Sequence, residues 1–379
     1  MATRPIKIAI VGDDSQLKKT LKRSSKQLEG FGKSVARVGA TAGLAFAATA
    51  TAIATKGVTA FADFEKGMNE VLTLLPGAGK EAFDRLGDQV KGLSKEMGIL
   101  PNEVIPALYQ SISAGIPEQN VAEFLRVAAM AAKGGITDLE TAVDGITSVT
   151  NSWGHEVISA TEASDLMFTA VRLGKTDFNQ MSKEIYKVGP IAAAVGIDFG
   201  SVTAALANLT AQGTPTAVAA TQLKAAFAEL AKEGTKADTA FRDFTGVGMT
   251  EFLAQGGTFE EALIKLKEGA DEAGISLVDV FGSIEAGAGM LALTSDGGAA
   301  FSATLAEMGA SAGATQVAFE TMDQGLSATF DKIKANLSVM AIETGEKLAP
   351  HVLAATEAIM DAFVRLQPHI ERAKEVVKE

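Results

Sequence analysis

One stretch of the chain occurs twice, and this duplication constrains the fold more than any other feature. Residues 97–115 align without a gap on residues 195–213, at an offset of 98 (195 − 97 = 98). Identical residues stand at Gly98/Gly196, Ile99/Ile197, Val104/Val202, Ala107/Ala205, Leu108/Leu206, Gly115/Gly213, Pro117/Pro215, Leu125/Leu223 and Ala128/Ala226.

The paired positions have the roles expected in a helical hairpin. The apolar residues recur at i, i+3 and i+4, which is one face of a helix. A glycine follows each helix and suits a left-handed C-terminal cap, and a proline then suits the start of the next helix. The repeat therefore predicts a duplicated pair of helices. Chance similarity between alanine-rich helices is the alternative.

Composition narrows the class of protein. The chain has 379 residues, of which 47% are hydrophobic and 6% aromatic, and a net charge of −12. This length suggests two or three domains, and the abundant alanine and glycine favour closely packed helices. The acidic balance argues against specific nucleic-acid binding, which needs a basic patch. Because the chain has no cysteine, disulfides and cysteine-ligated metals are excluded.

An uncharged stretch at residues 38–55 lies between Arg37 and Lys56. Its length of about 18 residues is at the lower limit for a membrane span, and its alanine, threonine and glycine are weakly apolar. Two interpretations stay open: a helix in a bilayer, or a helix buried in a homo-oligomer or a protein tube. The residues predicted to contact the membrane or another subunit are Leu44, Phe46 and Ile53.

The remaining pattern predicts a mainly α-helical protein with long terminal helices. Alternating isoleucines at 6–10 predict one short N-terminal strand. Apolar spacing predicts a long helix over 315–340, which Gly345 and Pro350 are expected to end. The predicted divisions are 1–36 (strand and basic amphipathic helix), 37–76 (long apolar helix), 77–345 (helical core, with repeat copies near 97–133 and 195–231) and 346–379 (a C-terminal helix, expected to continue in a longer protein).

Local signals in the core complete this prediction. Residues 137–140 match a capping box before a helix, and Thr258 is expected to cap another. Trp153, the only tryptophan, is interpreted as a core residue at a helix end.

Several short segments resemble catalytic motifs, but each lacks the surrounding residues or secondary structure that the motif requires. The Gly-Lys-Ser at 32–34 lacks the rest of a phosphate loop, and the glycines at 287–292 lack a surrounding βαβ unit. Ser15 and Lys18 lack the triplets that accompany a serine–lysine enzyme. The three histidines show no metal-ligand spacing. We predict no catalytic residue, no metal and no cofactor.

The order of several segments resembles phage tail tape measure proteins of the TP901 type, from about Phe64 to His351. The segments that carry the resemblance are Phe64–Met68, Met97–Ile99, Ser113–Gly115, Val127–Lys133, Gly189–Ile197, Ala211–Gly213, Leu326–Lys334 and Gly345–Pro350. The resemblance implies a structural protein that lies in the tail tube, sets tail length and leaves ahead of the DNA to help the genome across the host envelope.

The resemblance also implies partners and a location. These are further copies of the chain, with a trimer as the candidate state, the tail tube, tail chaperone and distal tail proteins, and the host inner membrane on ejection. The protein would be in the host cytoplasm during assembly and in the virion tail lumen afterwards. No peptidoglycan hydrolase and no long heptad region are recognisable, unlike in some family members. The alternatives are a pore formed by residues 38–55 and an unrecognised helical hydrolase.

Overall fold

The computed structural model describes residues 45–376, with side chains over 56–354. The described part is helical throughout and has no strand, which confirms the predicted mainly α class. The predicted strand at 6–10 and the basic helix after it lie outside the described residues.

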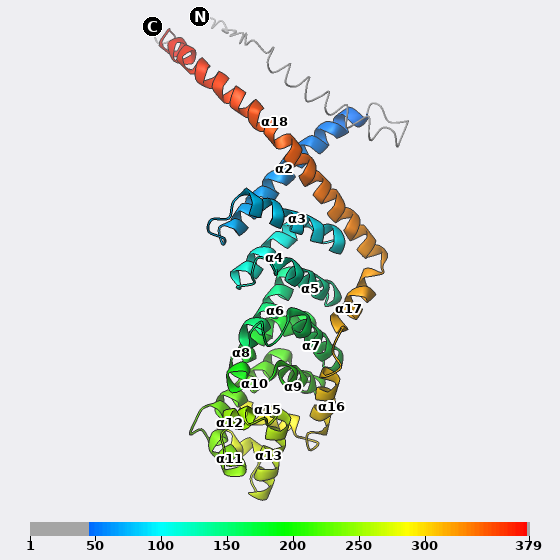
Figure 1. Ribbon diagram of the computed structural model, residues 1–379, viewed down its shortest axis with the longest axis vertical. Helices are drawn as coiled ribbons and strands as arrows, with labels where there is room; N and C mark the ends of the chain where they lie inside the picture. The colour runs from blue at the N-terminus through cyan, green and yellow to red at the C-terminus, as the bar shows by residue number, and fades with distance from the viewer. Residues whose placement is uncertain (1–44, 377–379) are drawn as a thin grey trace, which may run out of the picture. The chain divides into compact units, whose positions relative to one another are not determined.

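The helices follow one another with short connections (Figure 1). They are α2 (Ala45–Leu72), α3 (Lys80–Met97), α4 (Pro101–Ser113), α5 (Val121–Gly134), α6 (Leu139–Trp153), α7 (Ala160–Leu173), α8 (Phe178–Val195), α9 (Phe199–Ala211), α10 (Thr216–Ala231), α11 (Lys236–Thr245), α12 (Met249–Ala254), α13 (Phe259–Glu272), α14 (Leu277–Val280), α15 (Ile284–Leu293), α16 (Ala299–Met308), α17 (Ala314–Asp323) and α18 (Leu326–Val376).

The chain separates into two compact units. One consists of residues 67–336, and the other combines residues 1–66 with 337–379. The boundaries fall inside α2 and α18, so each of these helices contributes to both units.

The duplicated stretch forms the same structure twice. Adding 98 to the bounds of α3 and α4 gives the bounds of α8 and α9. Gly98 and Gly196 both have positive φ, as do Gly115 and Gly213. The hydrogen bond from Gly98 N to Ser94 O also recurs at the equivalent positions of the second copy. The predicted helical hairpin and its glycine turns are therefore confirmed.

The helices of the larger unit pack in two rows. In the first row α3 contacts α5, α5 contacts α7, and α7 contacts α9; in the second, α4, α6, α8 and α10 contact one another in that order (Figure 1). The two copies begin at α3 and α8, five helices apart. Because five is odd, every helix of the second copy lies in the opposite row from its equivalent.

Small residues let neighbouring helices within a row approach closely. A Cβ added to Gly145 of α6 would lie 2.4 Å from Ser182 Oγ of α8, so these helices touch through their backbones. Farther along, the buried rings of Phe227, Phe259 and Phe301 form a chain of edge-to-face contacts, with centroids 5.2 and 5.8 Å apart. This chain joins α10, α13 and α16 into one core.

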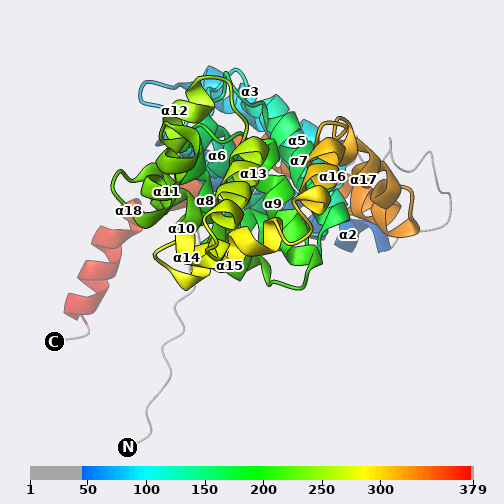
Figure 2. The ribbon, with the colours of Figure 1, turned by 90° about the horizontal axis from the view of Figure 1, so that it is seen from below.

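The segment after α15 returns along the first row. Helix α16 contacts α9 and α7, and α17 contacts α7 and α5, so both lie on one flank of the unit (Figures 1 and 2). We call α16 and α17 together the strap. The strap joins the end of the larger unit to its beginning.

The last helix corrects the sequence prediction in two places. The break predicted at Gly345 and Pro350 is absent, because α18 continues through both residues to Val376. A break occurs instead at Gln324 and Gly325, between α17 and α18. Proline removes one backbone hydrogen bond and bends a helix without always ending it, and α4 and α8 likewise contain Pro106 and Pro190.

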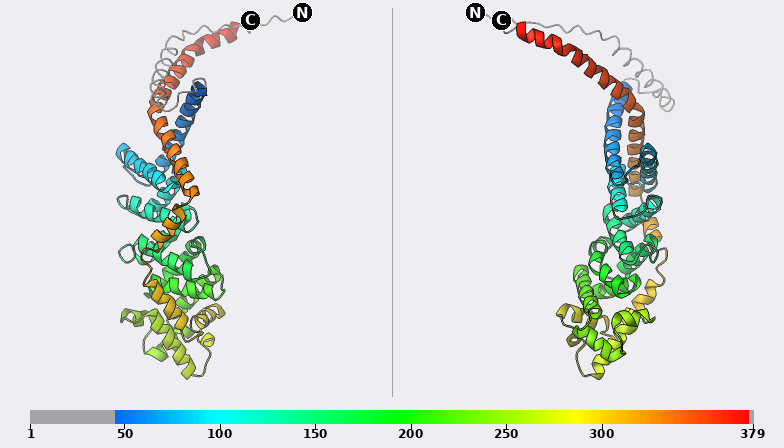
Figure 3. Two further views of the ribbon diagram at one scale, coloured as in Figure 1. Left: turned by 90° about the vertical axis from the view of Figure 1, so that its right-hand side faces the viewer. Right: turned by 60° about the vertical axis from the view of Figure 1, so that its left-hand side comes forward.

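The smaller unit is built on the crossing of α2 and α18 (Figure 3). A Cβ added to Gly345 would lie 1.9 Å from Gly57 O and 2.7 Å from Phe61 Cβ. The backbones therefore touch where these two glycines meet. Glycine at both positions is what permits this separation, and this contact explains why Gly345 does not end α18.

The turn glycines support a prediction on stability. We expect Gly213→Ala to lower the free energy of unfolding by about 1 kcal/mol, because an L-residue is strained at positive φ and no other atom lies within 4 Å of the new methyl group. We expect Gly98→Ala to cost about 1–3 kcal/mol more, since its methyl group would also meet Lys332 N at 2.8 Å. Urea unfolding followed by circular dichroism measures both, and equal losses would contradict the close contact at Gly98.

Candidate functional site

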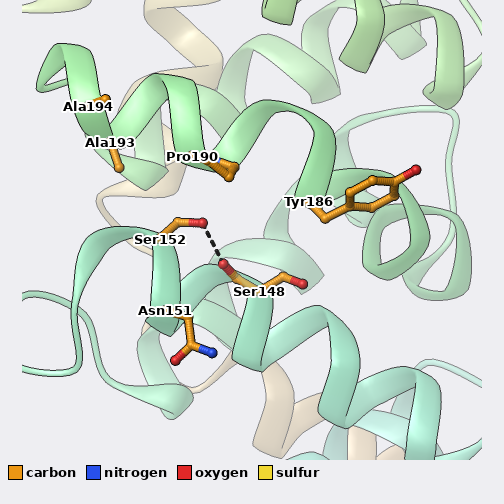
Figure 4. Close-up of a pocket in the computed structure, with 7 residues that line it drawn as sticks. All are labelled: Ser148, Asn151, Ser152, Tyr186, Pro190, Ala193 and Ala194. Carbon is orange, nitrogen blue, oxygen red and sulfur yellow. Dashed lines mark hydrogen bonds between the residues drawn. The ribbon is translucent and has the colours of Figure 1, made fainter. Parts of the chain in front are cut away.

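A shallow pocket of roughly 560 Å³ lies between α6 and α8 of the second row (Figure 4). Ser148 and Ser152 of α6 face Pro190 of α8, whereas the Tyr186 ring extends away from them. The pocket is lined by Ser148, Asn151, Ser152, Tyr186, Pro190, Ala193 and Ala194.

The polar groups of this pocket serve the fold. Ser152 Oγ donates to Ser148 O at 2.7 Å, and Asn151 Nδ2 donates to Ala114 O at 3.0 Å. The Nε2 atom of His155 bonds Asn151 Oδ1 at 3.1 Å. No serine here has an acid–base partner. Among the residues that the structure describes, no group of histidine, aspartate and glutamate could hold a metal ion.

Trp153 connects the end of α6 to the second copy of the repeat, next to this pocket. Its Nε1 donates to Ile197 O at 2.8 Å, and its ring lies 5.1 Å from that of Phe199. The side chain is half-buried, so the sequence interpretation of a core residue is only partly correct. The tryptophan fixes the end of α6 to the turn that begins the second copy.

A buried carboxylate holds the strap at the start of α17. Asp165 of α7 is 4% exposed, and its two oxygens accept from Gly313 N at 2.7 Å and Thr315 N at 2.8 Å. Ser164 and Thr315 share a hydroxyl hydrogen bond at 2.8 Å. The N-cap of α17 is Gly313, which has no side chain to offer. Asp165 thus satisfies the free N–H groups that every helix start presents.

An ion-pair cluster holds the other end of α17. Asp323 lies 3.2 Å from Lys133 Nζ of α5 and 2.5 Å from Lys332 Nζ of α18. Lys133 also donates to Met97 O at 2.5 Å and lies over the Phe319 ring. Burial acts to raise the pKa of Asp323, but the hydrogen bonds from the two lysines outweigh it and hold this pKa below its ordinary value of 3.8.

The lowered pKa of Asp323 predicts an acid-dependent contribution to stability. A carboxylate whose pKa is lower in the folded state than in the unfolded state stabilises the fold fully at a pH above its unfolded-state pKa. This stabilisation is lost as the pH falls through its folded-state pKa. We expect wild type to be more stable than Asp323→Asn at neutral pH, and the difference to shrink as the pH falls below 3.8 and through the lowered pKa of Asp323. Denaturant unfolding of both chains between neutral pH and pH 2.5 measures this. A difference that persists at the acid end would contradict the assignment.

The large apolar residues of α18 face solvent. Leu326, Phe330, Ile333, Leu337 and Met340 are between 48% and 80% exposed, and they follow one another at spacings of four, three, four and three residues. We call this set the outer face of α18. The buried positions lie on the opposite side of the helix and are Ala328, Ala335, Val339 and Ile342. The alternation of three and four is that of a coiled-coil seam.

Comparison with known proteins shows which proteins this chain is similar to. A family model described as "Phage-related minor tail protein" matches residues 87–273. The chain is similar to that tail protein family over these residues. A probable tape measure protein of Clostridium phage phiCD119 is 30% identical over 306 residues, which are 78% of this chain and 32% of that relative. Both findings confirm the resemblance to phage tail tape measure proteins.

The matched tail-protein region contains both copies of the repeat. The chain spans about a third of the length of its curated relative. No solved structure matches the chain.

The residues predicted to contact a membrane or a second subunit fall at the edge of the description. Leu44 lies outside the described residues, and Phe46 and Ile53 lie on α2 at positions whose side chains are not described. Within residues 45–376 no helix has the length and hydropathy needed to cross a bilayer. This finding does not support the candidate transmembrane helix at 38–55, of which residues 38–44 lie outside the described part.

Sequence reasoning missed the residues that hold the strap. Asp165 stands in mid-helix and its partners are about 150 residues away, so no local pattern marks it. The absence of a capping side chain at the start of α17 was the one available signal, because such a helix must find its partner elsewhere. The apolar spacing of the outer face of α18 could be recognised in the sequence, but the sequence did not indicate that this face is exposed to solvent.

Proposed function

We propose that this chain is the structural core of a phage tail tape measure protein, which occupies the lumen of the tail tube, sets tail length and is released at infection to aid passage of the genome. The similarity of residues 87–273 to a tail protein family supports this role.

The observation that carries the proposal is the pairing of this family similarity with the outer face of α18. A helix that exposes large apolar residues at three and four spacing is suited to lie against another helix. We propose that copies of the same chain cover it, with a trimer as the candidate state. Tail tube, tail chaperone and distal tail proteins are the further partners expected of a protein assembled inside a tail.

Tail length tests the proposed role directly. A helical insertion of 28 residues after Ala354, four whole heptads, keeps the outer face in register. If the helix spans the lumen lengthwise, each residue adds about 1.5 Å and the tail should lengthen by about 42 Å. Electron microscopy of virions carrying the altered gene measures this. A matched insertion of 28 residues in the loop at 297–298 should leave tail length unchanged; unaltered tails with both insertions would refute the role of α18 in measurement.

A further inference from the structure

The junction between α17 and α18 is where sequence pattern and structure disagree most. The apolar spacing predicts one helix over 315–340, whereas the structure interrupts it for only two residues, Gln324 and Gly325. Gly325 has open space around the position of a side chain, since the nearest atom is Ser327 N at 3.9 Å. Packing at this glycine therefore does not require the break.

The bend is held by contacts that a continuous helix could not make. Asp323 and Lys332 form an ion pair across the junction at 2.5 Å. In one unbroken helix, residues nine apart lie roughly 13.5 Å apart along the axis and on opposite sides. The Asp323–Lys332 pair therefore forms only when the junction is bent. The same carboxylate also binds Lys133 of α5, which fixes the end of α17 to the first row.

The start of α17 is held by a second, independent contact. Asp165 accepts from the backbone of Gly313 and Thr315, so it caps α17 only while this helix lies on α7. Between these two ends α17 fits closely on α5, because a Cβ added to Gly134 would meet Ala318 Cβ at 3.0 Å. The docked position is thus defined at its start, middle and end.

Straightening the junction would create a longer apolar surface. On a continuous helix, Phe319 and Met322 fall in the same sector of about 80° as the outer face of α18. Met322 is already exposed in the bent form and Phe319 is half-buried beneath Lys133. A straight helix therefore extends the outer face by two large side chains in the same helical register. In the bent form these two side chains are not aligned with the outer face.

We infer that α17 is a releasable part of the strap, and that the junction at Gln324 and Gly325 is a hinge between a bent, docked form and a continuous α17–α18 helix. Asp165 and Asp323 are the two positioning residues that hold the bent form. Any partner that covers the extended apolar face favours the straight form, because it binds that form more tightly. The hinge does not depend on the proposed role in the tail.

Distance measurement between two spin labels tests the hinge. The chain has no cysteine, so Gln316→Cys and Asn336→Cys can be labelled selectively at two exposed sites. In a continuous helix their Cα atoms are about 30 Å apart; in the bent form they are closer. We expect the shorter distance in wild type and a major population at the longer one when Asp165→Asn, Asp323→Asn and Gly325→Ala are combined.

Matched variants make each outcome decisive. Asp331→Asn removes a carboxylate from an i, i+3 pair with Lys334 inside α18, and it should keep the wild-type distance. If the triple variant does not fold, Gly325→Ala alone serves as the test. This substitution removes no contact, and we expect it to raise the population at the longer distance. The hinge would be overturned if the triple variant and Gly325→Ala both kept the wild-type distance distribution. It would also be overturned if they gave a broad distribution without a peak near the longer distance.

Discussion

Phe227→Ala is expected to lower the free energy of unfolding of the larger unit by about 3–5 kcal/mol, the usual cost of truncating a fully buried phenylalanine. Phe227 is 0% exposed and lies at one end of the ring chain that continues through Phe259 to Phe301. Its removal leaves a cavity where α10, α13 and α16 meet. The strap should therefore lose part of its support, and guanidinium unfolding measures the total loss.

Phe330→Ala is the matched control for this prediction. The same atoms are removed, but Phe330 is 60% exposed on the outer face of α18. A surface change of this kind usually stays within about 0.5 kcal/mol. Both measurements belong at low protein concentration, where contact between copies is least. Similar losses for the two variants would show that the ring chain is not the core of the unit.

Much of this fold could be predicted because its signals are local. The bounds of α3, Lys80–Met97, follow from apolar spacing between a glycine-rich turn and Gly98. Thr258 caps α13 as predicted, and it forms a full capping box with Glu261. The capping box predicted at residues 137–140 is displaced by one residue, because Asp138 caps α6 by accepting a hydrogen bond from Thr141 N. These features depend on four or five consecutive residues.

The features that escaped prediction depend on residues far apart in the chain. Gly345 reads locally as a helix end, yet it is a contact point because Gly57 lies against it. Asp165 reads as one of many helical carboxylates, yet its partners are Gly313 and Thr315. The two-row arrangement is likewise invisible in the repeat itself, because the sequence shows that two copies match but not on which side each lies.

Gly345→Ala is expected to destabilise the smaller unit by about 1–3 kcal/mol, as overpacking of a tight contact generally does. The new methyl group would lie 1.9 Å from Gly57 O, a backbone atom that cannot move away as a flexible side chain could. Helices α2 and α18 must therefore separate where they cross. We expect faster amide hydrogen exchange over residues 57–66 and 337–350, measured by mass spectrometry.

The opposite sign is expected for the same substitution at Gly92. That residue is an exposed interior position of α3 with no atom within 4 Å of an added Cβ. Alanine there should stabilise the helix by about 0.5–1 kcal/mol, because glycine is a poor helix former, and should slow exchange over residues 80–97. If Gly345→Ala instead slowed exchange as Gly92→Ala does, the backbones of α2 and α18 would not touch at that point. The contrast matters because it separates two reasons for glycine in an alanine-rich chain: a close helix crossing at Gly345, and a position without packing demands at Gly92.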